Sequence, residues 1–336
     1  MCDPSRLSLL LRCDEVKGRL WLRPMDGFNR ATRFAPSTTG LPHLGTLLSG
    51  LLCYLHARRE GARFVVRMEN LDRQRCKPEF QSAMLELLED FGLCADQIDV
   101  QSEHLDDYQR YLHRLANEGY VYYCRCSRGR LKAKAKRGPD GSFIYDNRCR
   151  KNHWKPGESF TDGNLRCRFP ETQLSFSDRL AGERTYKTLE HFGDPIVLRR
   201  DGAFSYHFSS IVDDERIGVT DIVRGRDLID STPSQLVLRN MFQMPVPDFF
   251  HHFLLMEDSK EKFAKLHGSI SVRHLRQKLS VDAVYGYLAL FMGLREDWRP
   301  MSLSELERDF SWERISRKDV LVRYNEESAK LFSQKL

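Results

Sequence analysis

Three short stretches of the sequence combine residue types that could carry chemistry. The first, RFAPSTTGLPHLGT (residues 33–46), is a Pro/Ser/Thr/Gly loop that begins at Arg33 and contains His43. Apolar residues at helical spacing follow it, so the loop leads into a buried helix whose N-terminal N–H groups could face an anion. An ordinary turn before a capped helix explains the stretch equally well, and the loop alone does not decide between them.

The second stretch is KFAKLHG (residues 262–268), in which Lys262 and Lys265 stand on the same short loop after a strand-like segment. Flexible lysines of this kind can reach phosphate groups as point charges. Taken alone, however, a solvated basic loop is the favoured explanation for this stretch.

The third stretch contains cysteines. Cys124 and Cys126 form a C-x-C pair, and Cys149 follows downstream with Tyr145 just before it. Two thiolates in one turn, closed by a distant third, suit tetrahedral zinc. A thiolate-rich closed site would be structural, because it leaves no open position for a substrate. Unpaired structural cysteines are the alternative that the spacing leaves open.

The composition is that of a globular protein that does not enter a membrane. Of 336 residues, 41% are hydrophobic and 30% are charged. No apolar run reaches about 18 residues, and the N-terminus lacks the pattern of a signal peptide, so we expect a cytoplasmic protein. Nine cysteines, an odd number, indicate reduced thiols or a metal site. The net charge of +6 is compatible with a nucleic-acid partner without requiring one.

The elements that must position these residues alternate between strand and helix. A strand at RFAP leads to a helix at 44–59, then a strand at 63–69, a helix that begins at Pro78, and a helix with its apolar stripe in HLDDYQRYLHRLANEG. This alternation predicts an α/β domain with a parallel, Rossmann-like sheet and a site at the carboxyl ends of its strands.

The second half of the chain changes character before the pattern returns. Residues 121–180 are basic and Gly-containing, with short strand-like pieces, and are interpreted as an insertion. Beyond them, a hairpin-type turn is predicted at Arg200–Gly202, a helix that opens at Pro233, and a strand in DFFHHFLLMED. Residues 269–336 are charged and are predicted to be helical.

These motifs carry a family resemblance. RFAPSTTGLPHLGT resembles the first signature of class I aminoacyl-tRNA synthetases, in the version of the glutamyl-tRNA synthetases, and KFAKLHG resembles the second. Between them, RMENLDR, SYHFSSIVDD and VTDIVRGRDLIDSTP follow in the order that this family uses. The match runs from about Arg33 to Leu294.

One branch of the family fits better. VRGRDLIDSTP and the C-x-C…Y-x3-C set also resemble the glutamyl-Q tRNA(Asp) synthetases. Residues 269–336 are too few for the anticodon-binding region of a full glutamyl-tRNA synthetase. The branch activates L-glutamate with ATP and attaches it to queuosine, a modified base in the anticodon loop of tRNA(Asp). A reduced glutamyl-tRNA synthetase that charges a tRNA 3′ end, or a non-catalytic zinc-bearing RNA-binding paralogue, are the alternatives.

The resemblance implies a domain organisation. It comprises an N-terminal extension (1–30), two halves of a Rossmann-like catalytic domain (31–120 and 181–268), a zinc-binding insertion (121–180) and a helical C-terminal region (269–336). We expect a monomer whose partners are L-glutamate, ATP and queuosine-containing tRNA(Asp).

The resemblance also implies a glutamate site. Glu69 would hold the substrate ammonium, Tyr206 would supply a hydroxyl, and Arg224 would pair with the side-chain carboxylate. Arg33 suits the other carboxylate, because a guanidinium can bind it in a bidentate manner. The contacts of the first loop would come from Arg33, Phe34, Ala35, Pro36 and Ser37. Structural ion pairs are the alternative for the charged residues.

For ATP and metal, the resemblance implies two further sets. His43 and Gly45 would face the phosphates of ATP. Lys265, together with Lys262, would face the charge that develops during adenylate formation, and Mg²⁺ would accompany the ATP. His43, Gly45 and Lys265 are the expected catalytic residues. One structural Zn²⁺ would be held by Cys124, Cys126, Tyr145 and Cys149.

The sequence departs from the family pattern at several positions. Thr38 stands where proline is usual, Ala264 where serine is usual, and Ser210 where asparagine is usual. The gap between Cys126 and Tyr145 is also long and basic. A solvated loop is favoured there over a contact with tRNA phosphates. Its basic residues are Arg128, Arg130, Lys132, Lys134, Lys136 and Arg137.

Overall fold

The structure, a computed structural model, describes residues 29–159, 162–256, 271–325 and 330–335. Lys262, Ala264 and Lys265, with nearly all of the N-terminal extension, lie outside the described residues. The chain forms two compact units. The first unit comprises the chain up to Val100, Thr220–Arg226 and the chain from Phe249 onward, and the second unit comprises Gln101–Val219 and Asp227–Asp248.

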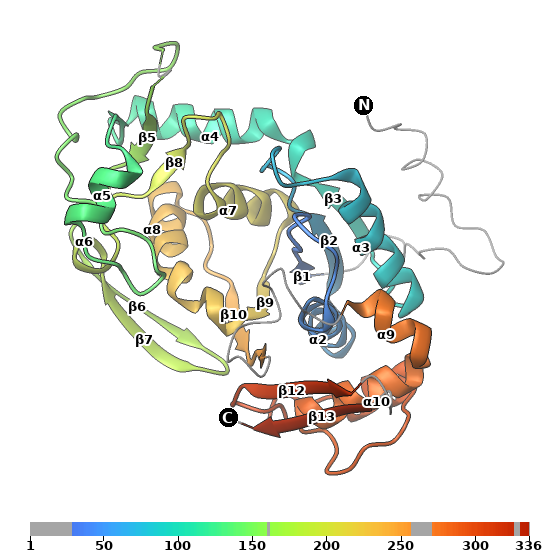
Figure 1. The fold of residues 1–336 in the computed structure, drawn as a ribbon. Coiled ribbons are helices and arrows are strands. Elements are labelled where there is room, and N and C mark those ends of the chain that lie inside the picture. Colours follow the sequence, from blue (N-terminus) through green and yellow to red (C-terminus); the bar gives the residue numbers. More distant parts are fainter. Residues whose placement is uncertain (1–28, 160–161, 257–270, 326–329, 336) are drawn as a thin grey trace. The chain divides into compact units, whose positions relative to one another are not determined.

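A sheet with a parallel core is the centre of the first unit (Figure 1). The strands of the sheet in this unit are, in spatial order, β3 (Gln97–Val100), β2 (Arg63–Met68), β1 (Ala31–Phe34), β9 (Asp221–Gly225) and β10 (Asp248–His252). β1 pairs in parallel with both β2 and β9, and β2 pairs in parallel with β3. The predicted parallel α/β core is therefore confirmed. The direction of strand order reverses between β1 and β9, which is where sites form in such sheets.

Helices join and cover these strands. α2 (Leu44–Glu60) and α3 (Pro78–Asp90) are the crossovers between β1, β2 and β3, as predicted. α2 ends at Gly61, whose positive φ of 59° permits the left-handed cap. The ring of Phe34 on β1 packs against Gly50 of α2. A Cβ added at Gly50 would lie only 3.3 Å from this ring.

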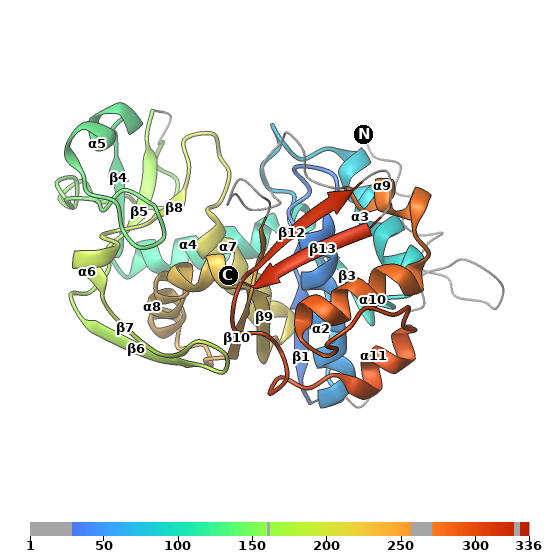
Figure 2. The same ribbon diagram turned by 60° about the horizontal axis from the view of Figure 1, so that its bottom comes forward.

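The C-terminal region of the first unit holds helices and then strands. Its elements are β11 (Leu255–Met256), α9 (Val272–Lys278), α10 (Val281–Met292), α11 (Leu303–Asp309), β12 (Val320–Asn325) and β13 (Lys330–Lys335). α11 packs against α2 (Figure 2). The predicted helices are present, but the segment VLVRYN forms β12 and pairs with β11 and β13. Its β-branched and aromatic residues favour a strand, so the helical expectation is wrong for the end of this region.

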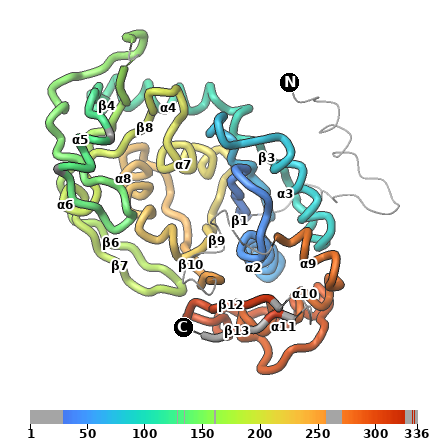
Figure 3. Tube along the Cα trace, in the orientation of Figure 1, coloured from blue at the N-terminus to red at the C-terminus, as the bar shows by residue number. Residues whose placement is uncertain are grey.

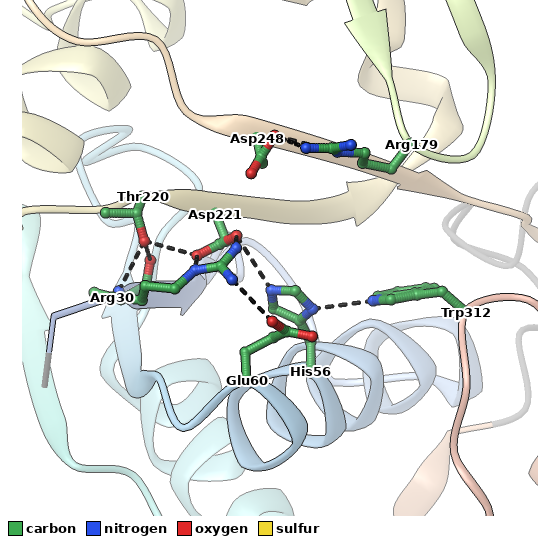
Figure 4. A network of polar contacts seen from close by, with 9 residues as sticks. Arg30, His56, Glu60, Arg179, Thr220, Asp221, Asp248 and Trp312 are labelled. Carbon is green, nitrogen blue, oxygen red and sulfur yellow. Dashed lines mark hydrogen bonds and ion pairs between the residues drawn. The ribbon is translucent and has the colours of Figure 1, made fainter.

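A buried polar network joins the amino ends of β1 and β9 to α2 (Figure 4). The carboxylate of Asp221 is fully buried and accepts hydrogen bonds from Arg30 Nε at 3.0 Å and Thr220 Oγ1 at 2.7 Å. His56 Nε2 lies 3.5 Å from Asp221, and its Nδ1 accepts a hydrogen bond from Trp312 Nε1 at 3.0 Å. Burial would raise the pKa of Asp221, but His56, Arg30 and Thr220 outweigh it and lower the pKa to about 2.

The second unit contains the insertion, which can be followed along the tube from β4 to β8 (Figure 3). β4 (Val121–Cys124), β5 (Asn164–Cys167) and β8 (Ile196–Leu198) form an antiparallel sheet, and β6 (Gln173–Asp178) and β7 (Gly182–Lys187) form a hairpin. The helical elements are η1 (Gln101–Glu103), α4 (Leu105–Asn117), α5 (Arg128–Lys134), α6 (Thr188–His191), α7 (Tyr206–Ile217), η2 (Arg226–Ser231) and α8 (Thr232–Phe242).

Two further predictions differ from the structure of this unit. The basic run after Cys126 includes the short helix α5, whose first turn is capped by Ser127, so the favoured loop is wrong for this part. The contacts also divide the chain differently from the predicted segments, because residues 101–120, 181–219 and 227–248 group with the insertion. Within the described residues, no helix is long and apolar enough to cross a membrane.

Candidate active site and metal centre

The strand register places the charged residues predicted for the glutamate site, Arg33 and Arg224, on one face of the sheet. The prediction is wrong for the side chain of Phe34, because its ring lies on the opposite face, against Gly50 of α2. Arg33 pairs with Val65, and Thr32 pairs with Asp221. Since side chains alternate along a strand, Arg33 and Arg224 lie on the same face, opposite to the Asp221 side chain that contacts α2. Both guanidinium groups belong to buried residues, at 3% and 5% exposure.

The β1–β2 ladder resumes beyond the end of β1. Ser37 and Glu69 form an isolated parallel bridge, which is the register of Arg33 and Val65 continued. The Glu69 N–H donates to the carbonyl oxygen of Pro36 at 3.1 Å, and the Thr38 N–H donates to the carbonyl oxygen of Glu69 at 3.2 Å. The loop of the first signature is thus fixed beside Glu69 at the carboxyl edge of the sheet.

Glu69 has a buried cationic partner that the motifs did not predict. Arg67 is fully buried, and its guanidinium donates to the Glu69 carboxylate at 3.0 Å. The Glu69 side chain is 15% exposed. An adjacent guanidinium favours the ionised carboxylate, so Glu69 is suited to bind an ammonium group. Arg33 and Arg224 on the same face supply cations for two carboxylates, which is the charge pattern of glutamate.

Tyr206 and Ser210 lie in the second unit, on α7. Tyr206 is the first residue of the helix and is half-buried. Ser210 is fully buried and accepts a hydrogen bond from Gln235 at 2.7 Å. The hydroxyl of Ser210 therefore joins α7 to α8.

His43 caps the helix that follows the first signature. Its Nδ1 accepts a hydrogen bond from the Gly45 N–H at 3.1 Å, and a capping box with Thr46 completes the cap. Burial lowers the pKa of His43 to about 4. The ring is therefore neutral at pH 7 and, with Nδ1 as acceptor, carries its proton on Nε2. It can donate a hydrogen bond to a phosphate but brings no charge. Lys262 and Lys265, the expected cations, lie outside the described residues.

The structure brings the predicted metal ligands together. The Sγ atoms of Cys124, Cys126 and Cys149 lie within 4.8 Å of one another, and all are free thiols. The Sγ atoms of Cys126 and Cys149 are 3.8 Å apart. The Tyr145 hydroxyl lies 3.3 Å from Cys124 Sγ and 3.6 Å from Cys126 Sγ.

These distances fit a tetrahedral ion. Zinc–sulfur bonds of about 2.3 Å at tetrahedral angles place two sulfurs about 3.8 Å apart, and a zinc–oxygen bond of about 2.0 Å places oxygen about 3.5 Å from sulfur. A disulfide would instead require about 2.05 Å between sulfurs. The three thiols can therefore hold a metal ion. The Tyr145 hydroxyl beside them also accepts a hydrogen bond from the Cys149 N–H at 3.2 Å.

The guanidinium group of Arg166 lies next to the Tyr145 ring of this cluster. The Arg166 guanidinium lies 3.9 Å from the centre of the Tyr145 ring. Burial would raise the pKa of the Cys124 thiol, but the Tyr145 hydroxyl and Arg166 outweigh it and lower this pKa. Burial raises the pKa of Tyr145, so without a metal the tyrosine stays protonated. Three thiolates around a divalent cation leave one negative charge, which Arg166 offsets.

A buried carboxylate fixes the chain next to these ligands. Asp194 is fully buried and accepts two hydrogen bonds from Arg150, at 2.6 and 2.7 Å. It also accepts from the Tyr122 hydroxyl at 2.7 Å and from the Phe169 N–H at 2.9 Å. Arg150 directly follows Cys149, so its ion pair with Asp194 holds the backbone next to this thiol.

A cavity of about 330 Å³ adjoins the cluster at Cys126 and Tyr145. Its basic lining residues are Arg130, Lys136 and Arg148, and its acidic ones include Asp146. Arg148 forms an ion pair with Asp146. Part of the basic run thus lines a hollow beside the thiols.

Sequence reasoning missed Arg67, Arg166 and Asp194. The first had a signal, because a charged residue inside the apolar strand FVVRM needs a buried partner. Arg166 and Asp194 had none, because their partners Tyr145 and Arg150 come from distant parts of the insertion.

Comparison with known proteins identifies the family of the chain. Residues 30–332 match the family described as tRNA synthetases class I (E and Q), catalytic domain. The chain is 37% identical over 310 residues to the Glutamyl-Q tRNA(Asp) synthetase of Symbiobacterium thermophilum, a match that covers 86% of this chain and 95% of that relative. The relative of the same name from Neisseria gonorrhoeae is 37% identical over 259 residues, covering 77% of this chain and 88% of the relative.

A longer relative and a solved structure extend the comparison. The Glutamate--tRNA ligase of Aquifex aeolicus is 34% identical over 273 residues, covering 77% of this chain and 56% of that protein. A crystal structure of a glutamate tRNA ligase from Elizabethkingia meningosepticum shares the fold, with a TM-score of 0.70 and 20% identity over 89% of this chain and 68% of that one. Because the family match spans most of the sequence, the chain belongs to the class I tRNA synthetases of the glutamate and glutamine group, a family of ligase-type enzymes.

Proposed function

We propose that this protein activates L-glutamate with ATP and transfers the glutamyl group to queuosine in the anticodon loop of tRNA(Asp). The observation that carries the proposal is the set of Arg33, Glu69 and Arg224 on one face of the sheet, whose charges complement those of glutamate. Similarity over most of the chain to relatives named Glutamyl-Q tRNA(Asp) synthetase supports the acceptor.

In the proposed complex, each carboxylate of glutamate meets a guanidinium. Arg33 binds the α-carboxylate and Arg224 the side-chain carboxylate, both in a bidentate manner. Glu69, which Arg67 contacts, accepts hydrogen bonds from the ammonium group. Glutamine would present an amide to Arg224, with an N–H group facing a cation, and is therefore disfavoured. The hydroxyl role expected of Tyr206, in the second unit, stays a prediction.

The activation step needs no side-chain nucleophile. An oxygen of the glutamate α-carboxylate attacks the α-phosphorus of MgATP, and pyrophosphate leaves with the electrons of the broken P–O bond. Positioning and charge neutralisation therefore supply the catalysis. Neutral His43 donates a hydrogen bond to phosphate oxygens near Gly45, and Lys262 and Lys265 are proposed to supply the positive charge.

The transfer step uses the mixed anhydride formed in the first step. A hydroxyl oxygen of queuosine attacks the acyl carbon, loses its proton, and AMP leaves. The protein's task is to hold this hydroxyl near the acyl carbon. Arg130 and Lys136 beside the cavity are proposed to contact tRNA phosphates, where cations contribute salt-dependent affinity. We further propose a cytoplasmic monomer.

Zinc is the proposed ion of the thiol cluster, with Cys124, Cys126, Cys149 and Tyr145 as its ligands. When bound, the ion would have a structural role, because a closed set of ligands leaves no position for a substrate. The residues themselves tie the end of β4 to the chain that precedes Arg150.

The test locates the glutamate on the tRNA. The protein is incubated with ATP, labelled glutamate, and tRNA(Asp) with or without queuosine. A third tRNA carries queuosine but lacks the 3′-terminal adenosine. We expect equal labelling of the two queuosine-containing tRNAs and none of the queuosine-free tRNA. Labelling that requires the terminal adenosine would instead establish 3′ charging. Absence of glutamate-dependent pyrophosphate exchange would favour the non-catalytic alternative.

A further inference from the structure

A buried histidine contacts the arginine proposed to recognise the glutamate side chain. Arg224 Nε donates a hydrogen bond to His251 Nε2 at 2.9 Å. The two residues are 5% and 3% exposed. They lie on β9 and β10, which are neighbours in the sheet of the first unit (Figure 1).

This hydrogen bond determines the protonation state of the imidazole. An N–H of arginine is always a donor, so His251 Nε2 must be the acceptor. The ring is therefore neutral in this arrangement, with its proton on Nδ1. A protonated ring would have no acceptor atom and would place two cations in contact.

The ring of His251 is held in place by its own strand. It stacks on the ring of Phe249, with centroids 6.0 Å apart and planes 13° from parallel. The side chain of the next residue, His252, lies on the opposite face of β10, since its Nε2 contacts Ser49 on α2 at 3.2 Å. His251 thus belongs to the face that carries Arg33 and Arg224.

The bond also decides which edge of the guanidinium can meet a carboxylate. A bidentate carboxylate uses either Nε with one terminal nitrogen or the two terminal nitrogens together. His251 uses Nε, so only the edge formed by Nη1 and Nη2 can bind a carboxylate in a bidentate manner.

We propose that His251 is a positioning residue for substrate selection: it holds Arg224 so that the Nη1–Nη2 edge meets the side-chain carboxylate of glutamate. The inference rests on the proposed function of Arg224. A guanidinium without this support rotates about its side-chain bonds and can offer one N–H to the amide oxygen of glutamine. Loss of His251 therefore weakens both glutamate binding and the discrimination against glutamine.

The experiment compares His251→Leu, which removes the acceptor, with His251→Gln, whose amide oxygen can replace Nε2. Pyrophosphate exchange is measured with glutamate and with glutamine, with and without tRNA. For His251→Leu we expect a glutamate KM raised roughly 10-fold with kcat within about threefold, and a lower ratio of kcat/KM for glutamate over glutamine. His251→Gln should restore most of both.

His252→Gln is the matched control, because it alters an equally buried histidine on the other face of β10. It should lower the melting temperature without changing the glutamate-to-glutamine ratio. An unchanged ratio in His251→Leu, while Arg224→Gln strongly raises the glutamate KM, would overturn this inference alone. Glutamate-dependent exchange that is absent from the wild type, or unaffected by Arg224→Gln, would overturn the proposed function as well.

Discussion

The backbone N–H of Thr38 donates a hydrogen bond to the carbonyl oxygen of Glu69 over 3.2 Å, and the Thr38 hydroxyl reaches the same oxygen at 3.3 Å. The side chain is almost fully buried, at 1% exposure. The Thr38 carbonyl in turn accepts from the N–H of Lys77, just before α3. Thr38, where the family resemblance predicts proline, thus anchors the first-signature loop by hydrogen bonds.

Thr38→Pro should impair glutamate binding more than it impairs folding. Proline removes the N–H donor, at a cost of about 1 kcal/mol, but it also reduces the entropy of the unfolded chain by a comparable amount. We expect the free energy of unfolding to change by less than about 1 kcal/mol, while the glutamate KM in pyrophosphate exchange rises roughly fivefold because Glu69 shifts. Thr38→Val keeps the N–H, so its glutamate KM should stay within about twofold of the wild-type value. A wild-type KM in Thr38→Pro would show that this N–H does not position Glu69.

The limits of sequence reasoning can be seen at this same loop. Its place between a strand and a helix followed from apolar spacing, which is a local signal. The Thr38–Glu69 hydrogen bond depends on the register of β1 against β2, which no local pattern contains. Metal-ligand candidates were found because cysteines are rare and conspicuous. Their support by Arg166 required the insertion to be folded.

The secondary structure shows the same difference between features with a local signal in the sequence and features without one. Helices α2 and α3 were predictable from apolar residues at helical spacing and from Pro78 at a helix start. Strand β12 was missed because charged residues precede it, and its pairing with β11 joins segments far apart in sequence. Helix α5 was missed because a basic run resembles a solvated loop, whereas its Ser127 cap is a weak signal.

Gly193→Ala should disturb the metal centre. Gly193 has a φ of +65°, and a Cβ there would lie 2.6 Å from the Tyr145 carbonyl oxygen and 2.7 Å from its nitrogen. The backbone of Tyr145 would have to move, and its hydroxyl with it. We expect a lower zinc-to-protein ratio by elemental analysis after dialysis against a weak chelator, together with a lower melting temperature.

Gly202→Ala is the matched control for this substitution. Gly202 has a φ of +81°, and a Cβ there would have no neighbour within 4 Å. This variant carries only the strain of a left-handed alanine, about 1–2 kcal/mol, and should keep its metal. Equal metal content in the two alanine variants would contradict the role of Gly193.

His43 should make the protein less stable in mild acid. Its pKa is lowered from 6.5 to about 4 by burial, so the unfolded chain binds a proton in a pH range where the folded protein does not. Stability is therefore lost as the pH falls from about 6.5 to about 4, and this residue contributes about 2 kcal/mol of the loss at pH 4.5. His43→Asn keeps an acceptor for the Gly45 N–H but does not titrate. Urea unfolding at pH 7 and pH 4.5 should show a smaller pH-dependent loss in the variant, and an identical loss in both proteins would refute the assignment.

Trp312→Phe should destabilise the first unit through the network of Figure 4. The indole N–H donates to Nδ1 of the fully buried His56 at 3.0 Å, and phenylalanine would leave that nitrogen without this donor. An unsatisfied buried acceptor costs about 1–3 kcal/mol, and the lost ring volume adds to it. Trp298→Phe is the comparison, because Trp298 is 42% exposed and its indole donates to a backbone carbonyl at 3.3 Å. Chemical denaturation should give a loss at least about 1.5 kcal/mol larger for Trp312→Phe than for Trp298→Phe. Similar losses for the two variants would mean that the hydrogen bond to His56 adds little to the stability of the fold.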